Sequence, residues 1–317
     1  MTKLIKSTVL TGSLAICVSA ILWGLDGIAL TPHLYNLNIG FVVFIVHFIP
    51  FVIMNTFLFR EYRLLSKLSL KDIILLSLVA LTGGAVGTMA IVKALFLVEF
   101  QDLSVVVLLQ KLQPVFAITL AYFFLGEKMR ERFFLWAGIA IIASYFLTFG
   151  VNLPNLKTGS RTALAAGYSL LAAFAFGSAT VLGKSVLSKF TFYSATFFRY
   201  GFTSFFMLVF IMITGNIKEV QFVTPHNWVI ILIIAFTVGS GAIFLYYYGL
   251  RKVPAMLATI CELCFPLSAI VFDYVFNDRL LSPIQWLSAA IMLYAIIRLT
   301  ISPVAKVQKE NKKKSFK

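Results

Sequence analysis

The sequence predicts an all-α membrane protein with ten transmembrane helices, arranged as two inverted five-helix repeats. Of its 317 residues, 60% are hydrophobic and 12% are charged, whereas about a quarter are charged in an ordinary soluble domain. A helix needs about 20 apolar residues to cross a bilayer. Ten such runs follow one another, at residues 10–30, 39–59, 73–95, 104–125, 133–150, 163–183, 191–214, 228–249, 254–276 and 283–302.

The two halves of the chain share a series of motifs in the same order. The series is an aromatic-glycine step, a glycine-rich run, a proline in the middle of the fourth span and an acidic-basic pair after it. In the first half these are Trp23-Gly24, Gly83–Gly87, Pro114 and Glu127-Lys128; in the second they are Phe176-Gly177, Gly239–Gly241, Pro266 and Asp278-Arg279. Because each half holds five spans, an odd number, the second half is predicted to be inverted in the bilayer.

This repetition divides the chain into four parts. Residues 1–150 form the first five-helix repeat and residues 163–302 form the second. Between them, residues 151–162 are rich in turn-forming residues and too few for a domain, so they are predicted to be a linker. Residues 303–317 form a basic tail.

The positions of the cations orient the chain in the membrane. Most of the 27 lysines and arginines fall in segments that share a side with the N-terminus, and by the positive-inside rule this side is cytoplasmic. The segments on the opposite side hold only Lys157, Arg161, Lys218 and Arg279. We therefore expect a multi-pass protein of the cell inner membrane with both termini in the cytoplasm, and we assign the net charge of +15 to this orientation rather than to nucleic-acid binding.

The two mid-span prolines predict breaks in their helices. A proline cannot donate its amide, so the carbonyl four residues earlier, of Gln110 or Glu262, loses its usual partner. In a membrane such a group must be satisfied locally. Pro114 and Pro266 are thus candidate hinges, and the Gln110 carbonyl is a candidate contact for a substrate.

Lys111 and Glu262 are the strongest candidates for substrate binding. They lie at comparable depth just before the two prolines, where an ionisable side chain costs about 2.5–3.5 kcal/mol to insert. One interpretation places them in a common cavity, where Glu262 binds a substrate amine or a proton and Lys111 meets a carboxylate. The alternative is a structural ion pair.

Other residues within the spans are weaker candidates, each with a structural alternative. Trp23, Tyr246 and Tyr247 could stack on a flat or cationic ligand or belong to an interfacial aromatic belt. Arg199 could bind a substrate carboxylate or extend its charge towards the interface. Asp26 and His47 join Glu262 as candidates for proton coupling, although solvation and packing also explain them. We expect no metal site and no cofactor.

The order and duplication of these motifs, over residues 10–302, resemble the EamA-type members of the drug/metabolite transporter superfamily. The resemblance implies ten helices around a central cavity and transport of metabolites by alternating access, often as efflux. The second copy departs from the family pattern, because Asn277-Asp278-Arg279 replaces the Gly-Glu pair.

From these features we expect a secondary transporter and not an enzyme. The sequence has no nucleotide-binding loop, and small amphipathic metabolites such as amino acids, with efflux favoured, are the first expectation. The alternative is an uptake carrier for a nucleotide-type or cofactor-type metabolite. An integral-membrane enzyme is the least favoured class, because the three histidines are scattered along the chain. The expected partners are a small-molecule substrate and the lipid bilayer, with no nucleic acid, for a monomer or homodimer.

Overall fold

The computed structural model describes residues 2–99, 103–129, 131–153, 160–277 and 282–301, and it is helical without strands over these ranges. Ten stretches are long and apolar enough to cross a membrane, which confirms the ten predicted spans: Ser7–Leu34, Ile39–Lys67, Leu70–Leu97, Val106–Leu125, Glu131–Phe149, Arg161–Val186, Phe192–Ile213, Pro225–Lys252, Ala255–Phe276 and Pro283–Ile301. The tail 303–317 and half of the predicted linker lie outside the described residues.

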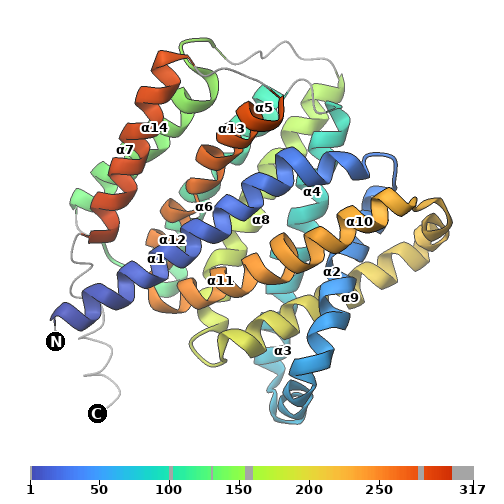
Figure 1. Ribbon diagram of the computed structural model, residues 1–317. Helices are drawn as coiled ribbons and strands as arrows, with labels where there is room; N and C mark the ends of the chain where they lie inside the picture. The colour runs from blue at the N-terminus through green and yellow to red at the C-terminus, as the bar shows by residue number, and fades with distance from the viewer. Residues whose placement is uncertain (1, 100–102, 130, 154–159, 278–281, 302–317) are drawn as a thin grey trace, which may run out of the picture.

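Several spans consist of more than one helical element (Figure 1). The α-helices are α1 (Thr2–Leu25), α2 (Ile39–Leu58), α3 (Leu70–Val79), α4 (Gly87–Leu97), α5 (Leu103–Gln110), α6 (Gln113–Leu125), α7 (Glu131–Phe149), α8 (Ser160–Val186), α9 (Phe192–Ile213), α10 (Pro225–Ile234), α11 (Ser240–Lys252), α12 (Ala255–Cys261), α13 (Cys264–Asn277) and α14 (Pro283–Ile301). Between them lie the π-helical segments η1 (Asp26–Leu30), η4 (Ala80–Val86) and η6 (Ala235–Gly239) and the 3₁₀ segments η2 (Thr31–Leu34), η3 (Phe59–Lys67) and η5 (Asn216–Phe222).

The third span of each repeat is built in the same way. Both begin with a capping box, Ser69 with Asp72 in α3 and Thr224 with Asn227 in α10, which satisfies the free amides of the first turn. Both then pass through a π-helical segment at their glycine-rich run before continuing as an α-helix. The internal repeat is therefore visible in local structure as well as in sequence.

The first helix of each repeat packs against the fourth span of the other repeat. Gly24 of α1 lies against α13, where an added Cβ would stand 2.1 Å from Ser268 Oγ. Gly177 of α8 lies against α6, where a Cβ would stand 3.1 Å from the Gln113 carbonyl oxygen. The two repeats thus exchange equivalent contacts, and the glycine steps allow the backbones to approach closely.

Equivalent helices of the two repeats run antiparallel where they meet. In the pair α2 and α9, Gly40 near the start of α2 lies beside Phe210 near the end of α9. In the pair α7 and α14, Gln285 near the start of α14 donates to the Leu147 carbonyl near the end of α7 at 3.0 Å. This arrangement is what an inverted repeat requires. The pair α7 and α14 lies at one edge of the bundle (Figure 1).

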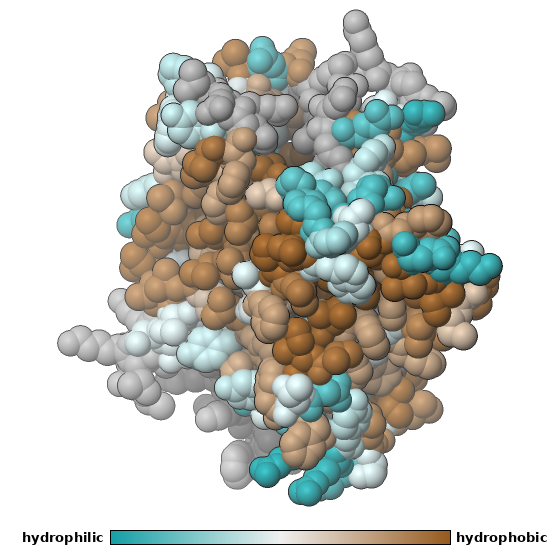
Figure 2. Space-filling view, turned by 45° about the vertical axis from the view of Figure 1, so that its right-hand side comes forward, coloured by the Kyte–Doolittle hydropathy of each residue, from teal (hydrophilic) through white to brown (hydrophobic). Residues whose placement is uncertain are grey.

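The surface carries many large apolar side chains, as expected where lipid rather than water surrounds the helices. Phe123, Phe124 and Ile213 are each more than 70% exposed. Figure 2 shows a broad hydrophobic area over the middle of one face, with hydrophilic side chains towards its right-hand and lower edges.

Candidate functional site

The fourth span of each repeat is interrupted just before its proline. The break between α5 and α6 falls at Lys111 and Leu112, and the break between α12 and α13 falls at Glu262 and Leu263. The two breaks confirm the predicted interruptions. The Glu262 carbonyl, which the proline deprives of its usual partner, is satisfied locally as expected, because it accepts a hydrogen bond from the Phe265 amide at 2.9 Å. A tighter turn therefore replaces the bond that the proline removes.

The Glu262 carboxyl is the centre of a polar cluster that joins both repeats. Its Oε2 accepts a hydrogen bond from Gln113 Nε2 at 2.6 Å, and its Oε1 accepts one from the Tyr246 hydroxyl at 2.7 Å. Thr180 Oγ1 lies 2.8 Å from the same hydroxyl. The Trp23 ring packs on Tyr246 with 5.3 Å between centroids. Polar groups and aromatic faces thus meet at one level of the bundle.

Lys111 and Glu262 line the same cavity, whose volume is about 50 Å³. Lys111 Nζ donates to Ser144 Oγ on α7 at 2.8 Å, and no ion pair joins Lys111 to Glu262 within the described part of the chain. The cavity is bordered by Val107, Gln110, Lys111, Gln113, Pro114, Thr259, Glu262, Leu263, Phe265 and Pro266. The structure thus brings the predicted residues Lys111, Gln110 and Glu262 together with both candidate hinges.

Arg199 belongs to a second, neighbouring cluster. It is 7% exposed, and its guanidinium donates to the Gly83 carbonyl at 2.9 Å and to the Tyr247 hydroxyl at 3.2 Å. Tyr247 is fully buried. Because consecutive residues of a helix point about 100° apart, Tyr246 is directed to Glu262 while Tyr247 is directed to Arg199. Neither Arg199 nor Tyr247 lines the cavity.

Asp26 and His47 lie apart from the Glu262 cluster. Asp26 accepts a hydrogen bond from Thr31 Oγ1 at 3.0 Å, within its own turn of the chain. His47 Nδ1 lies 2.8 Å from the Val43 carbonyl, and its ring packs on Tyr200. The contacts of Asp26 with Thr31 and of His47 with Val43 are local, whereas the ring contact joins His47 on α2 to Tyr200 on α9.

Sequence reasoning missed Gln113, Thr180, Thr259 and Ser144, which surround the two charged side chains. Each is a neutral polar residue in an apolar span, so a search for intramembrane charges does not find it. Gln113 does adjoin Pro114, and Thr180 follows Phe176 by one helical turn on the same face. The positions of Gln113 and Thr180 relative to these motifs could therefore have predicted both residues.

Polar contacts link helix ends on the side of the bundle that the charge pattern places in the cytoplasm. Glu127 accepts hydrogen bonds from the Ala255 amide at 2.7 Å and from the Met256 amide at 3.0 Å, at the start of α12. Lys184 donates to the Leu250 carbonyl at 2.7 Å. Burial raises the pKa of the Glu127 carboxyl above its ordinary value, while the two amides and the charge of Lys184 act to lower it.

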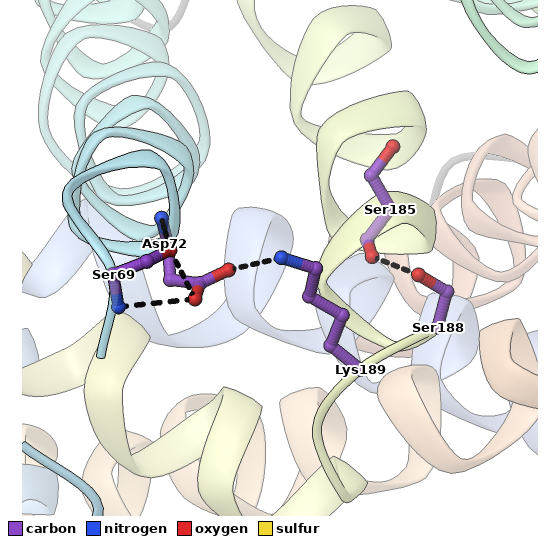
Figure 3. Close-up of polar contacts among 5 residues, drawn as sticks. All are labelled: Ser69, Asp72, Ser185, Ser188 and Lys189. Carbon is purple, nitrogen blue, oxygen red and sulfur yellow. Dashed lines mark hydrogen bonds and ion pairs between the residues drawn. The ribbon is translucent and has the colours of Figure 1, made fainter. Parts of the chain in front are cut away.

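A further contact at this end also joins the two repeats. Lys189, which follows α8, forms an ion pair with Asp72 of α3 at 2.6 Å, and Figure 3 shows its side chain reaching across to Asp72. Asp72 accepts in addition from Ser69. The opposite end is tied by Asn227, which donates to the His33 carbonyl at 2.9 Å.

A larger hollow of about 570 Å³ lies between α2, α9 and α11 and contains none of the predicted site residues. Its border is mainly aromatic: Ile53, Phe57, Phe192, Tyr193, Phe236, Ser240, Gly241, Phe244, Leu245 and Tyr248. Tyr193 and Phe236 are 50% and 62% exposed, so this hollow opens onto the apolar surface of the bundle.

Comparisons with known proteins agree with this architecture. The model of the EamA-like transporter family matches residues 10–149 and 163–301. The chain is 47% identical over 290 residues to the riboflavin transporter ImpX of Fusobacterium nucleatum, covering 91% of this chain and 97% of that protein. It is 26% identical over 196 residues to the uncharacterized transporter YwfM of Bacillus subtilis, covering 60% and 62% of the two chains. A solved crystal structure shares its fold with a TM-score of 0.67 and 12% identity, over 92% of this chain and 96% of the other.

Proposed function

The chain belongs to the EamA-like transporter family, and from this premise we propose that it carries riboflavin, or a closely related cofactor-type solute, into the cell. The similarity to the riboflavin transporter ImpX, at 47% identity over nearly the whole of both chains, is the observation that carries the proposal. It favours the cofactor-type alternative over amino acids. The match to the EamA-like transporter family confirms the resemblance that the sequence motifs indicated.

The geometry of the site supports a flat, polar-edged solute. Trp23 and Tyr246 do not border the cavity, but Tyr246 donates to Glu262, which does, and Trp23 packs on Tyr246. Rings of this kind stack on flat ligands. Glu262 and Gln113 offer hydrogen-bonding groups at the same level. Riboflavin combines a flat ring system that has a polar edge with a hydroxylated chain, so it can use both kinds of group.

An amino acid would use the site differently. Its ammonium and carboxylate need opposite charges, and Glu262 and Lys111 border one cavity. Both are instead engaged by neutral partners, Gln113 and Ser144. These polar groups therefore suit a neutral hydrogen-bonding edge at least as well as a zwitterion. The similarity to a riboflavin transporter supports the neutral, cofactor-type solute.

The cavity must enlarge for a solute of this size to bind. Its volume of about 50 Å³ is well below the roughly 300–1,000 Å³ of sites for drug-sized ligands. Polar contacts close the bundle at both ends. We infer a closed intermediate of an alternating-access cycle, in which the breaks at Pro114 and Pro266 serve as hinges.

We also place this multi-pass protein in the cell inner membrane, with both termini on the cytoplasmic side, as a monomer or homodimer. We infer a carrier without catalytic activity, because its family and its relatives are transporters. We further propose that transport is coupled to protons, with Glu262 as the candidate proton site.

Counterflow into proteoliposomes tests the proposed substrate. Vesicles loaded with unlabelled riboflavin should accumulate labelled riboflavin from outside, whereas vesicles loaded with amino acids should not. Growth of a riboflavin auxotroph on low external riboflavin, with and without the protein, tests the inward direction. Exchange of amino acids without exchange of riboflavin would overturn the proposal.

A further inference from the structure

The cavity between the two broken helices contains a buried polar atom that has no partner. Thr259 is fully buried, and its Oγ1 makes no hydrogen bond in the described part of the chain. It borders the cavity on the same helical face as Glu262, one turn away. Leaving a buried hydroxyl unpaired is costly, so the cavity is built to receive a polar group.

The two broken helices contribute complementary groups to this cavity. Glu262, at the end of α12, brings a carboxyl that accepts hydrogen bonds. Lys111 and Gln113, at the break between α5 and α6, bring donors. Each has further hydrogens to donate, because an ammonium has three and an amide nitrogen has two.

We propose that Glu262, Lys111 and Gln113 bind the imide edge of a pyrimidine-dione ring. This proposal rests on the proposed function and specifies how the substrate is recognised. An imide edge presents a carbonyl, an N–H and a second carbonyl in a row. Its N–H would donate to Glu262, and its carbonyls would accept from Lys111 and Gln113. In riboflavin this edge is C2=O, N3–H and C4=O.

Two aromatic side chains, Trp23 and Tyr246, are the proposed contacts for the face of the ring. The Tyr246 hydroxyl donates to the Glu262 carboxyl, and the Trp23 ring packs on Tyr246. Once the cavity enlarges, a ring held at Glu262 by its imide edge would meet these two aromatic side chains next. A site that hydrogen-bonds a substrate N–H rejects an analogue without it far more strongly than a purely apolar pocket does. The inferred contacts therefore predict selectivity at N3 of the ring.

Two riboflavin analogues test the inference in the parent protein. N3-methylriboflavin loses the N–H, whereas an 8-dimethylamino analogue keeps the whole imide edge and enlarges the opposite end. We expect N3-methylriboflavin to compete with labelled riboflavin about 10- to 100-fold more weakly than riboflavin does, the loss expected for an unpaired buried group. The 8-dimethylamino analogue should compete within about 3-fold of riboflavin.

Two variants then locate the selectivity. In Glu262→Ala the difference between riboflavin and N3-methylriboflavin should shrink to within about 3-fold. Gln113→Leu should weaken riboflavin and narrow the same difference, because the Glu262 carboxyl loses the amide that holds it in place. Glu99→Ala, at an exposed position outside the cavity, should keep the parent ratio. Size-exclusion profiles show which variants fold. If only one of Glu262→Ala and Gln113→Leu folds, that variant alone is enough for the comparison.

The outcomes separate this inference from the proposed function. If riboflavin is transported but N3-methylriboflavin competes equally well, or if the ratio stays unchanged in Glu262→Ala and Gln113→Leu, the imide contact is overturned and riboflavin transport stands. If riboflavin is neither bound nor transported, the proposed function fails and the inference fails with it.

Discussion

Lys111 and Glu262 occupy equivalent interruptions in two broken helices and line one cavity, yet each is hydrogen-bonded to a neutral side chain rather than to the other. Lys111 donates to Ser144 at 2.8 Å, and Glu262 accepts from Gln113 at 2.6 Å. Within the described residues the ion pairs are Arg161 with Glu99 and Lys189 with Asp72. The two charged groups thus border one cavity without pairing with each other in the described part of the chain.

Glu262→Gln should reduce riboflavin counterflow by at least about tenfold. Gln113 and Tyr246 each donate to a different oxygen of Glu262, and the substitution turns one of these acceptors into an NH₂ donor. The change keeps the shape of the side chain, so expression and thermal stability should stay near those of the parent. Glu99→Gln is the matched control, since Glu99 is 57% exposed in a surface ion pair that contributes little. Equal transport by the two variants would show that Glu262 is not at the site.

Lys111→Met should lower transport while leaving the protein as stable as the parent or more stable. The substitution removes a donor from the cavity and also removes the cost of desolvating an ammonium. Counterflow and thermal unfolding in detergent measure the two effects on one preparation. Lys93→Met is the control, because Lys93 is an exposed lysine in the preceding span. A loss of stability with unchanged transport would instead assign Lys111 a structural role.

Arg199→Lys should destabilise the protein by about 1–3 kcal/mol, because a lysine cannot reproduce the two contacts of the guanidinium with Gly83 and Tyr247. Riboflavin affinity should change less than about threefold, since Arg199 lies outside the cavity. Thermal unfolding and ligand titration separate the two quantities. A large loss of riboflavin affinity in Arg199→Lys at unchanged stability would show that Arg199 does belong to the binding site.

Glu127→Ala should open the bundle at the end nearest α12, because it leaves the amides of Ala255 and Met256 without their acceptor. The readout is the rate at which an impermeant maleimide labels an Ala255→Cys variant, which should rise about tenfold on loss of these contacts. Glu131→Ala, at an exposed position nearby, should leave the rate unchanged. Unaltered labelling in Glu127→Ala would show that this contact does not hold the end closed.

Gly24→Ala should destabilise the protein by about 1–3 kcal/mol, the usual cost of overpacking, because the new methyl would stand 2.1 Å from Ser268 Oγ. Gly138→Ala is the matched control, since outside its own stretch of helix no atom of the described residues lies within 4 Å of a Cβ built there. The difference in melting temperature between the two variants measures the closeness of the contact between α1 and α13. Equal melting temperatures would contradict this packing.

The sequence alone predicted the spans, the repeat and the two broken helices, because apolar length and proline chemistry act locally. One of its two interpretations of Lys111 and Glu262 placed them in a common cavity, since the repeat sets them at comparable depth, and the other made them an ion pair. It did not predict that Tyr246 and Tyr247 divide between two clusters or that Gln113 and Thr180 complete the site. Those features depend on how each helix is rotated against its neighbours, which packing across the repeats decides. The π-helical segments at the glycine-rich runs also went unpredicted, because they arise where helices from both repeats meet.

A structure determined with bound riboflavin tests the location of the site most directly. We expect density for the ring system between the two broken helices, with its imide edge at Glu262 and Gln113 and its face near Trp23 and Tyr246. Density in the aromatic hollow bordered by Phe192, Phe236 and Tyr248, with the cavity at Glu262 still closed, would contradict it.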